Sequence, residues 1–347
     1  MDALTIIRPD DWHVHLRQGA MLARAARDSA RVFSRAMVMP NLSPPVTTLA
    51  RALDYRAEII KALPPDSDFE PLMSLYLTDR ATPREVDAAA DSGGRVVGFK
   101  WYPAGATTNT DAGVTRIADL MPVLERIAER DLVLQVHAET RDPQVDVFDR
   151  EAVFIERTLA PLQRALPQLK IVLEHVTTEQ GVQFVRDAGS QVAATITAHH
   201  LLLNRNEMFR RGLRPHAYCL PVLKRERHRR ALLAAATGGE RAFFLGTDSA
   251  PHARRDKESA CGCAGIYTAH AALELYAEAF DRADALDQLE GFASHHGADF
   301  YAVARNTGTL TLHRKPWRVA DSYAIDERDE LVPMRAGEEV AWSVSVD

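Results

Sequence analysis

The sequence predicts an α/β fold of the (β/α)8, or TIM, barrel class. Eight short apolar runs recur along the chain, and polar loops with amphipathic helical segments separate most of them. This alternation is typical of a parallel sheet whose strands are joined by crossover helices. The sequence also lacks a linker rich in Ser, Gly and Pro. We therefore expect a single domain over residues 1–347, with a peripheral extension from about residue 308.

The first apolar run, residues 11–17, carries the pattern on which the functional prediction depends. His13, His15 and Arg17 occupy alternate positions, and Trp12 and two aliphatic residues lie between them. Alternate side chains of a β-strand share a face, so the two imidazoles and the guanidinium should project the same way. Two imidazoles on one face can chelate a metal ion, and the arginine can hold an anion beside it.

The other runs and helices follow in order. Thr82 with Pro83 predicts a helix start, Thr177 or Thr178 can cap a later helix, and Pro122 is expected to bend another. The extension from residue 308 is expected to add a small strand pair or to wrap the barrel. The further predicted strands are 35–41, 71–77, 96–102, 132–137, 170–175, 191–197 and 242–248, and the predicted helices include 49–63, 115–131, 151–166 and 265–280.

Composition excludes several classes of protein. Among 347 residues, 46% are hydrophobic and 26% charged, and the net charge of −6 argues against a nucleic-acid partner. No apolar run is long enough to span a membrane, and residues 1–9 are too short and too polar for a secretion signal. Three cysteines, Cys219, Cys261 and Cys263, are too few for a disulfide framework and are expected to pack in loops. We therefore expect a cytoplasmic protein.

Candidate ligands and bases gather at the ends of the predicted strands. In TIM barrels the active site lies at the carboxyl ends of the strands. Four imidazoles, one amine and one carboxylate are expected on that rim. They belong to His13, His15, Lys100, His137, His175 and Asp248.

These side chains favour zinc, and they suggest two ions. Imidazole and carboxylate are ligands that zinc prefers, and four histidines exceed what one catalytic zinc needs. A pair of ions requires a bridging ligand, and Lys100 is the candidate. Burial beside cations favours its neutral amine, which can add carbon dioxide to give an anionic carbamate. The competing chemistry for a lysine at a strand end is a Schiff base.

Longer stretches resemble the dihydroorotases of the shorter bacterial type, in the amidohydrolase superfamily. The resemblance covers nearly the whole chain, and the Cys-Gly-Cys-Ala-Gly stretch at 261–265 is among its most specific parts. Phe99 and Trp101, which flank Lys100, are bulkier than the family pattern. The stretches that carry the resemblance are 8–17, 38–42, 44–48, 102–104, 106–109, 218–221, 246–253 and 257–259.

The resemblance implies a site with two zinc ions per chain. His13, His15 and Asp248 would hold the more buried ion, and His137 and His175 the other. Lys100, carboxylated on its side-chain nitrogen (N6-carboxylysine), and a hydroxide would bridge the ions. The substrate-binding residues implied by the resemblance are His15, Arg17, Asn41, His137, Leu220, His252 and Ala264, and Thr107 and Thr108 would ride on a flexible loop that closes over the substrate.

The implied reaction is the reversible cyclisation of N-carbamoyl-L-aspartate to L-dihydroorotate with loss of water, the third step of pyrimidine synthesis. Asp248 would take the proton of the hydroxide and deliver it to the departing ring nitrogen. A homodimer is implied as well. The nearest alternative is another cyclic amidase, a hydantoinase or dihydropyrimidinase. An alternative from a different functional class is a metal-free barrel that has no enzymatic activity and serves as a structural or assembly partner of another protein.

The remaining histidines and the basic run are expected to have no role in the site. The predicted surface or helix-end histidines are His199, His200, His270, His295 and His296. The basic run at 224–230 is expected to be a solvated helix face.

Overall fold

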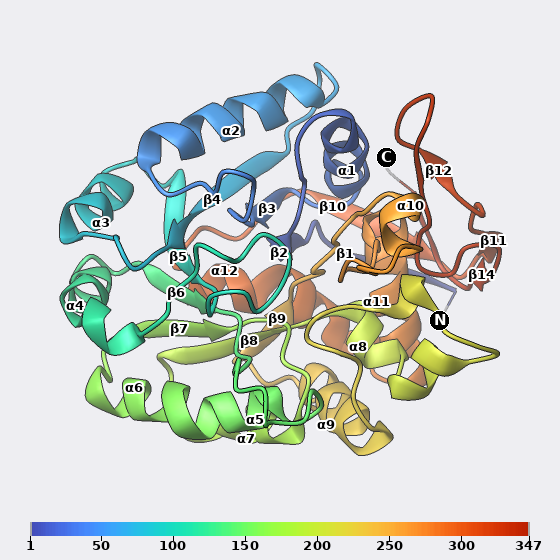
Figure 1. The fold of residues 1–347 in the computed structure, drawn as a ribbon. Coiled ribbons are helices and arrows are strands. Elements are labelled where there is room, and N and C mark those ends of the chain that lie inside the picture. The colour runs from blue at the N-terminus through green and yellow to red at the C-terminus, as the bar shows by residue number, and fades with distance from the viewer. Residues whose placement is uncertain (1, 346–347) are drawn as a thin grey trace.

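A computed structural model describes residues 2–345 and confirms the (β/α)8 barrel. Eight parallel strands follow one another around the sheet in sequence order, with helices outside them (Figure 1). All eight lie within the predicted runs or within a residue of them. They are β2 (Asp10–Val14), β3 (Arg35–Val38), β4 (Glu70–Leu77), β5 (Val96–Trp101), β6 (Val133–Val136), β7 (Lys170–Leu173), β8 (Val192–Ile196) and β9 (Phe243–Leu245).

The ring closes where β2 meets the segment that follows β9. The backbone N–H of Asp248 donates to the carbonyl of His13 (2.8 Å), and that of His15 donates to the carbonyl of Ser249 (3.1 Å). The buried carboxylate of Asp11 accepts from the backbone N–H (2.9 Å) and the hydroxyl (2.6 Å) of Thr247. These bonds join the first and last strands of the barrel at the end where the candidate residues lie.

The helices begin largely where the sequence predicts. Thr48 caps α2 by accepting from the N–H of Arg51, Thr82 and Glu85 form a capping box on α3, and Thr178 caps α7. The α-helices are α1 (Ala20–Ala30), α2 (Leu49–Ala62), α3 (Pro83–Ala90), α4 (Met121–Glu129), α5 (Arg150–Phe154), α6 (Ala160–Ala165), α7 (Glu179–Asp187), α8 (Ala198–Leu202), α9 (Glu226–Thr237), α10 (Arg254–Lys257), α11 (Ala272–Arg282) and α12 (His296–Phe300).

Three predicted helices differ from the structure. The helix predicted at 115–131 opens with a 3-10 turn, Ile117–Leu120, before α4. A π-helical stretch, Ile155–Leu159, separates α5 from α6. The helix predicted from residue 265 begins only at Ala272, because Ile266 and Tyr267 are extended and form bridges to Ser249 and Pro333.

Trp12 does not share the environment of Val14 and Leu16, contrary to the alternating pattern. The register of β2 shifts between Asp11 and Val14, and Trp12 joins a separate core cluster with residues of α12. There its ring stacks on Tyr301 with centroids 4.3 Å apart. The cluster also contains one residue from each of six further barrel strands, so it fills the interior of the barrel. These residues are Met37, Leu72, Val133, Val172, Ala193 and Phe244.

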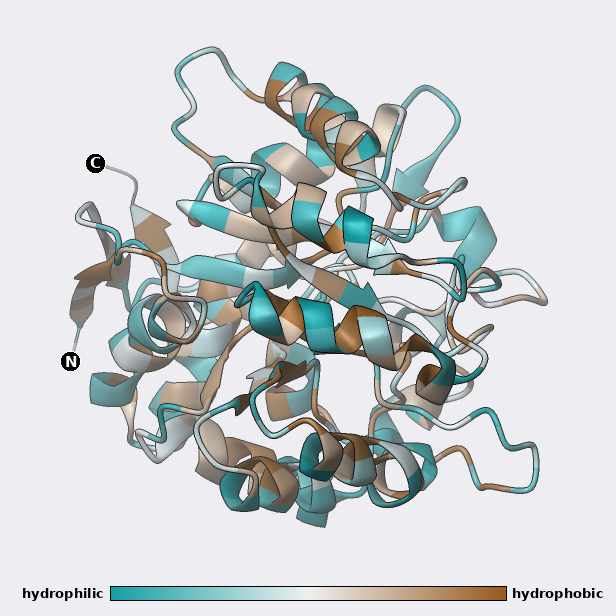
Figure 2. Ribbon diagram, turned by 90° about the vertical axis from the view of Figure 1, so that its left-hand side faces the viewer, coloured by the Kyte–Doolittle hydropathy of each residue, from teal (hydrophilic) through white to brown (hydrophobic). Residues whose placement is uncertain are grey.

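The main core lies between the sheet and the surrounding helices. Phe99 and Trp101 belong to it, and Trp101 packs against Phe154 with ring centroids 5.2 Å apart. The two bulky residues beside Lys100 therefore fill space outside the barrel. In Figure 2 the peripheral helices are banded teal and brown, the colouring expected of amphipathic helices.

The segment from residue 308 forms a small antiparallel sheet with a strand that the sequence analysis missed. β1 (Ala3–Ile7) pairs with β10 (Thr309–His313), which pairs with β15 (Ser343–Ser345). This sheet lies at one side of the molecule (Figure 2). Two shorter pairs join β11 (Trp317–Arg318) to β14 (Glu339–Val340) and β12 (Tyr323–Ala324) to β13 (Glu330–Leu331). No helix within residues 2–345 has the length and apolar character needed to cross a membrane.

Candidate active site

The carboxyl ends of the barrel strands meet around one small cavity. Twelve of the predicted site residues line it or lie directly beneath it, and Tyr102, Ala250 and Gly265 complete its wall. The predicted residues that line it are His13, His15, Arg17, Asn41, Thr107, Thr108, His137, His175, Leu220, Asp248 and Ala264. Lys100 lies fully buried below, and His252 stands behind Arg17.

Three polar atoms form a compact triangle in the cavity. Nε2 of His13 lies 3.3 Å from Nε2 of His15 and 3.3 Å from Oδ1 of Asp248, and the other two atoms are 3.1 Å apart. Zinc bonds of about 2.0–2.1 Å in a tetrahedral site place neighbouring ligand atoms about 3.3 Å apart. The three side chains therefore fit one zinc ion without rearrangement.

The histidines beside this triangle form a second group. The ring centroids of His137 and His175 are 4.8 Å apart, and those of His13 and His175 are 5.1 Å apart. His13, Glu174 and His175 also place ligand-type atoms close enough to share an ion. Burial lowers the pKa of His175 well below its usual range, and it lowers that of His15 to about 4. Neutral imidazole is the form that binds metal.

Glu174 is a buried acidic residue of the site that the sequence analysis did not single out. Its carboxylate pairs with the amine of Lys100, and its Oε2 lies 2.7 Å from Nδ1 of His13. Burial lowers the pKa of Lys100, although the carboxylate of Glu174 opposes that shift. The available signal was a charged residue inside the buried strand run, immediately before His175.

Three residues of the site hold their side chains on strained backbone. Arg17, His175 and Asp248 have φ values of 60°, 42° and 43°, in the left-handed region that favours glycine. Such conformations persist only where the surrounding structure enforces them, and they cluster at functional sites. In this chain each of them follows a barrel strand and turns a side chain toward the cavity.

Arg17 forms a cationic wall with His252 beside it. Its Nε donates to the carbonyl of Pro251 (3.2 Å), and its Nη2 lies 3.0 Å from Nε2 of His252. Burial, together with the charge of Arg17, lowers the pKa of His252 to about 2, so the imidazole is neutral. The hydroxyl of Tyr55 donates to the carbonyl of Arg17 (2.6 Å) and fixes its backbone.

The segment with Thr107 and Thr108 lies over the cavity. The side-chain amide of Asn41 donates to the carbonyl of Thr108 (3.0 Å), and that of Asn109 donates to the carbonyl of Asn41 (3.2 Å). The hydroxyl of Thr110 donates to the carbonyl of Thr107 (2.7 Å). The loop is therefore fastened to the segment that follows β3, and it forms part of the cavity wall.

Some residues outside the site lie deeper than the sequence predicts, although the three histidines concerned do lie in short helices, as one of the two predicted alternatives allows. His199, His200 and His270 are buried, because α8 turns into the molecule directly after β8 and Thr268–Ala271 lies beneath the small strands. Lys224 and His228 of the basic run are also buried. Cys219 is buried as expected. Cys261 is exposed, and its sulfur lies 3.8 Å from that of Cys263.

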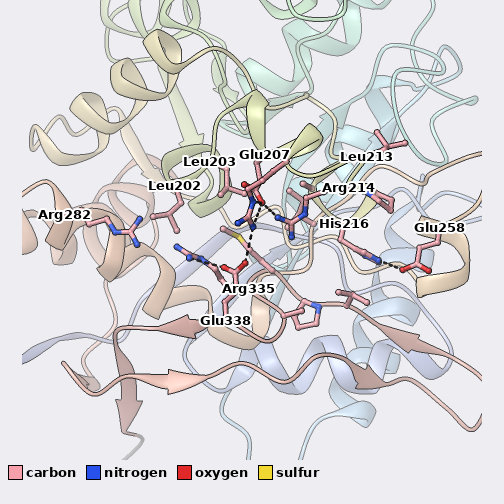
Figure 3. A pocket seen from close by; sticks show the side chains of 18 residues that line it. Leu202, Leu203, Glu207, Leu213, Arg214, His216, Glu258, Arg282, Arg335 and Glu338 are labelled. Carbon is pink, nitrogen blue, oxygen red and sulfur yellow. Dashed lines mark hydrogen bonds and ion pairs between the residues drawn. The ribbon is translucent and has the colours of Figure 1, made fainter.

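A larger cleft, of about 570 Å³, lies away from the predicted residues, between segments 202–217 and 332–338. Figure 3 shows that its charged side chains face one another. Arg214 pairs with Glu207, Arg335 with Glu338, and His216 with Glu258. The charges of this cleft are compensated internally, so it is a weaker candidate for chemistry than the strand ends.

Comparison with known proteins agrees with the fold and with the resemblance. The Amidohydrolase family model matches residues 5–338. A dihydroorotase of Aromatoleum aromaticum is 60% identical over 344 residues, which are 99% of this chain and 100% of the relative. A dihydroorotase of Cupriavidus taiwanensis is 61% identical over 339 residues, 98% of each chain.

A solved structure extends the similarity to three dimensions. The crystal structure of dihydroorotase in complex with 5-fluoroorotic acid from Saccharomyces cerevisiae has a TM-score of 0.91 and 33% sequence identity, and 99% of each chain is covered. The chain belongs to the amidohydrolase family and, within that family, to the dihydroorotases, which are cyclic amide hydrolases.

Proposed function

We propose that this chain interconverts N-carbamoyl-L-aspartate and L-dihydroorotate with two zinc ions and a carboxylated Lys100. The observation that carries the proposal is the triangle of His13, His15 and Asp248, whose spacing of 3.1–3.3 Å suits a zinc ion. His137 and His175 would hold the second ion. A pair of zinc ions, when bound, would supply an acidified water and an electrophile for the amide carbonyl.

Lys100 fits the role of the shared ligand because it is fully buried among the candidate ligands. Burial favours the neutral amine. Addition of carbon dioxide to the neutral nitrogen forms one N–C bond and releases one proton, and it leaves a carbamate with two oxygens. A carbamate can ligate two ions at once, whereas a protonated amine would repel them.

The substrate carboxylate would bind at Arg17, with Asn41 and His252 beside it. A guanidinium matches a carboxylate through two parallel hydrogen bonds. The neutral imidazole of His252 next to Arg17 leaves the positive charge of the arginine for the substrate. Backbone groups of Leu220 and Ala264 would contact the ring. The complex of the Saccharomyces cerevisiae relative with 5-fluoroorotic acid supports a carboxylated pyrimidine as the ligand.

Asp248 would act as the proton carrier between water and the ring nitrogen. Its carboxylate lies in the cavity beside both His13 and His15. Thr107 and Thr108, on the loop over the cavity, would exclude water and donate to the charge that develops on the substrate oxygen. A homodimer is part of the proposal and is tested by sedimentation.

The deciding experiment pairs metal analysis with an assay on three cyclic amides. We expect about two zinc ions per chain and hydrolysis of L-dihydroorotate, with little activity on hydantoin or dihydrouracil, which lack the carboxylate. A preference for hydantoin or dihydrouracil would favour the hydantoinase alternative. A chain that binds no zinc and hydrolyses none of the three would favour the structural barrel.

A further inference from the structure

A buried glutamate outside the predicted site holds one of the candidate ligands. Oε2 of Glu139, two residues after His137 and just beyond β6, lies 2.9 Å from Nε2 of His137. Both side chains are almost fully buried, with exposed fractions of 2% and 1%. The backbone N–H of Glu139 also donates to the carbonyl of His137 (3.2 Å). A tight turn thus brings the carboxylate back to the ring.

This contact decides which nitrogen of His137 is available. A neutral imidazole carries one proton, and a carboxylate acceptor draws that proton to the nitrogen it faces. With Nε2 engaged by Glu139, the lone pair lies on Nδ1. His13 and His15 differ, because they turn Nε2 toward Asp248. His137 therefore offers Nδ1 to a metal ion, whereas His13 and His15 offer Nε2.

We propose that Glu139 is a positioning residue that fixes the tautomer and the ring orientation of His137, so that Nδ1 faces the second metal ion. The inference rests on the proposed metal-dependent function and deepens it. A carboxylate behind a ligating histidine orients the ring and raises its basicity, and loss of such a partner weakens metal binding about 10- to 100-fold.

The surroundings of Glu139 keep its carboxylate charged. Burial raises the pKa of Glu139, but its hydrogen bond with the His137 ring and the Lys224 and Arg150 cations outweigh that effect. Lys224 is itself buried and donates to the carbonyl of Val222 (3.0 Å).

The first test uses metal-free protein, in which activity plays no part. Two-bond ¹H–¹⁵N spectra of the histidine rings at mildly alkaline pH should show His137 as the Nε2–H tautomer. Glu139→Gln retains an oxygen acceptor and should keep this tautomer, whereas Glu139→Leu should lose it. A His137 that keeps the Nε2–H tautomer in a folded Glu139→Leu variant would overturn the proposal.

The second test measures zinc affinity by competition with a chelator. Glu139→Leu should weaken the weaker-binding zinc about 10- to 100-fold, Glu139→Gln should weaken it less, and the tighter zinc should change little. Glu274→Gln is the matched control, because Glu274 is equally buried but pairs with Arg31 away from the site. It should leave both zinc affinities unchanged.

The outcomes separate this proposal from the proposed function. Unchanged affinity for both ions in Glu139→Leu and Glu139→Gln would refute the positioning role even if the enzyme hydrolyses dihydroorotate. If Glu139→Leu does not fold, Glu139→Ala, which also lacks an acceptor, decides instead: zinc affinities equal to those of the parent would contradict the proposal. A parent that binds two zinc ions but does not hydrolyse dihydroorotate would instead contradict the function.

Discussion

The side-chain amide of Asn41 donates to the backbone carbonyl of Thr108 at 3.0 Å, and this bond ties the end of one barrel strand to the loop over the cavity. Asn41 also lines the cavity itself. Under the proposed function, this one side chain would both touch the substrate and hold the loop against the segment that follows β3.

Asn41→Ala should impair both binding and turnover. Loss of the amide frees the loop and removes a substrate contact, so we expect KM to rise and kcat to fall by about tenfold. Steady-state kinetics and hydrogen exchange across residues 104–112 measure the two effects. Asn206→Ala, at an exposed asparagine, is the control. Unchanged exchange in Asn41→Ala would show that the bond does not hold the loop.

Lys100→Ala should release one or both zinc ions and abolish nearly all activity, because the shared ligand is lost. Metal analysis after gel filtration measures the loss, and circular dichroism verifies that the variant is folded. Short carboxylic acids should restore part of the metal and the activity. Unchanged zinc content without added acid would contradict the bridging role. The exposed Lys61→Ala serves as a control.

Arg17→Lys should raise KM for dihydroorotate about tenfold or more while zinc content stays constant. Lysine keeps the positive charge but loses the planar pair of donors that matches a carboxylate. Kinetics on dihydroorotate, together with metal analysis, test the expectation. Kinetics equal to those of the parent would remove Arg17 from the carboxylate site.

The stability of the folded chain should depend on pH through Asp11. Burial raises the pKa of its carboxyl to about 7 in the folded chain, from 3.8. Between about pH 4 and pH 7 the folded state holds a proton that the unfolded state releases, so the free energy of unfolding falls as pH rises. Asp11→Asn lacks this contribution.

Metal-free parent and Asp11→Asn proteins should therefore be compared by urea unfolding from pH 4 to pH 8. The difference in stability between them should shift in favour of the variant as pH rises through this range. A difference that does not change with pH would show that Asp11 has an ordinary pKa in the folded chain.

Gly297 should tolerate no side chain, because a Cβ there would lie 2.0 Å from Nε1 of Trp12. Gly297→Ala must displace the Trp12 ring from its stack on Tyr301, and we expect a loss of about 1–3 kcal/mol or more in stability. Gly308→Ala is the matched control, since a Cβ at Gly308 meets no atom within 4 Å. Urea unfolding compares the two. Equal stabilities would mean that the barrel interior can repack.

The sequence predicted the barrel because its strongest signals are local. Alternation of apolar runs with amphipathic helices sets the strand order, and Thr48, Thr82 and Thr178 mark helix starts by capping bonds within three residues. Features that depend on distant partners could not be predicted. β1 becomes a strand only because β10 lies beside it. Trp12 leaves its expected environment because of a register shift against β3.

At the site, too, local patterns could be predicted from the sequence, and contacts between distant residues could not. The His-x-His spacing suggests His13 and His15 as candidates, and the strand ends support it by adding Lys100, His137, His175 and Asp248. Glu139, Glu174 and Asp11 are single acidic residues whose importance comes only from what they touch. A carboxylate in a strand run has many possible partners, and the sequence does not say that Glu174 lies against Lys100 and His13.

The pairing of β1 with β10 constrains how the molecule is made. Ile7 faces Thr309, and the first barrel strand meets the last one only after Asp248 has been synthesised. Neither the β1–β10 pair nor the contact that closes the barrel can form on the ribosome until most of the polypeptide has emerged. The growing chain therefore carries open strand edges for most of translation. A nascent chain interrupted before β9 leaves the edge of β2 opposite β3 unpaired, and it is expected to be a substrate for chaperones and proteases rather than a smaller working enzyme.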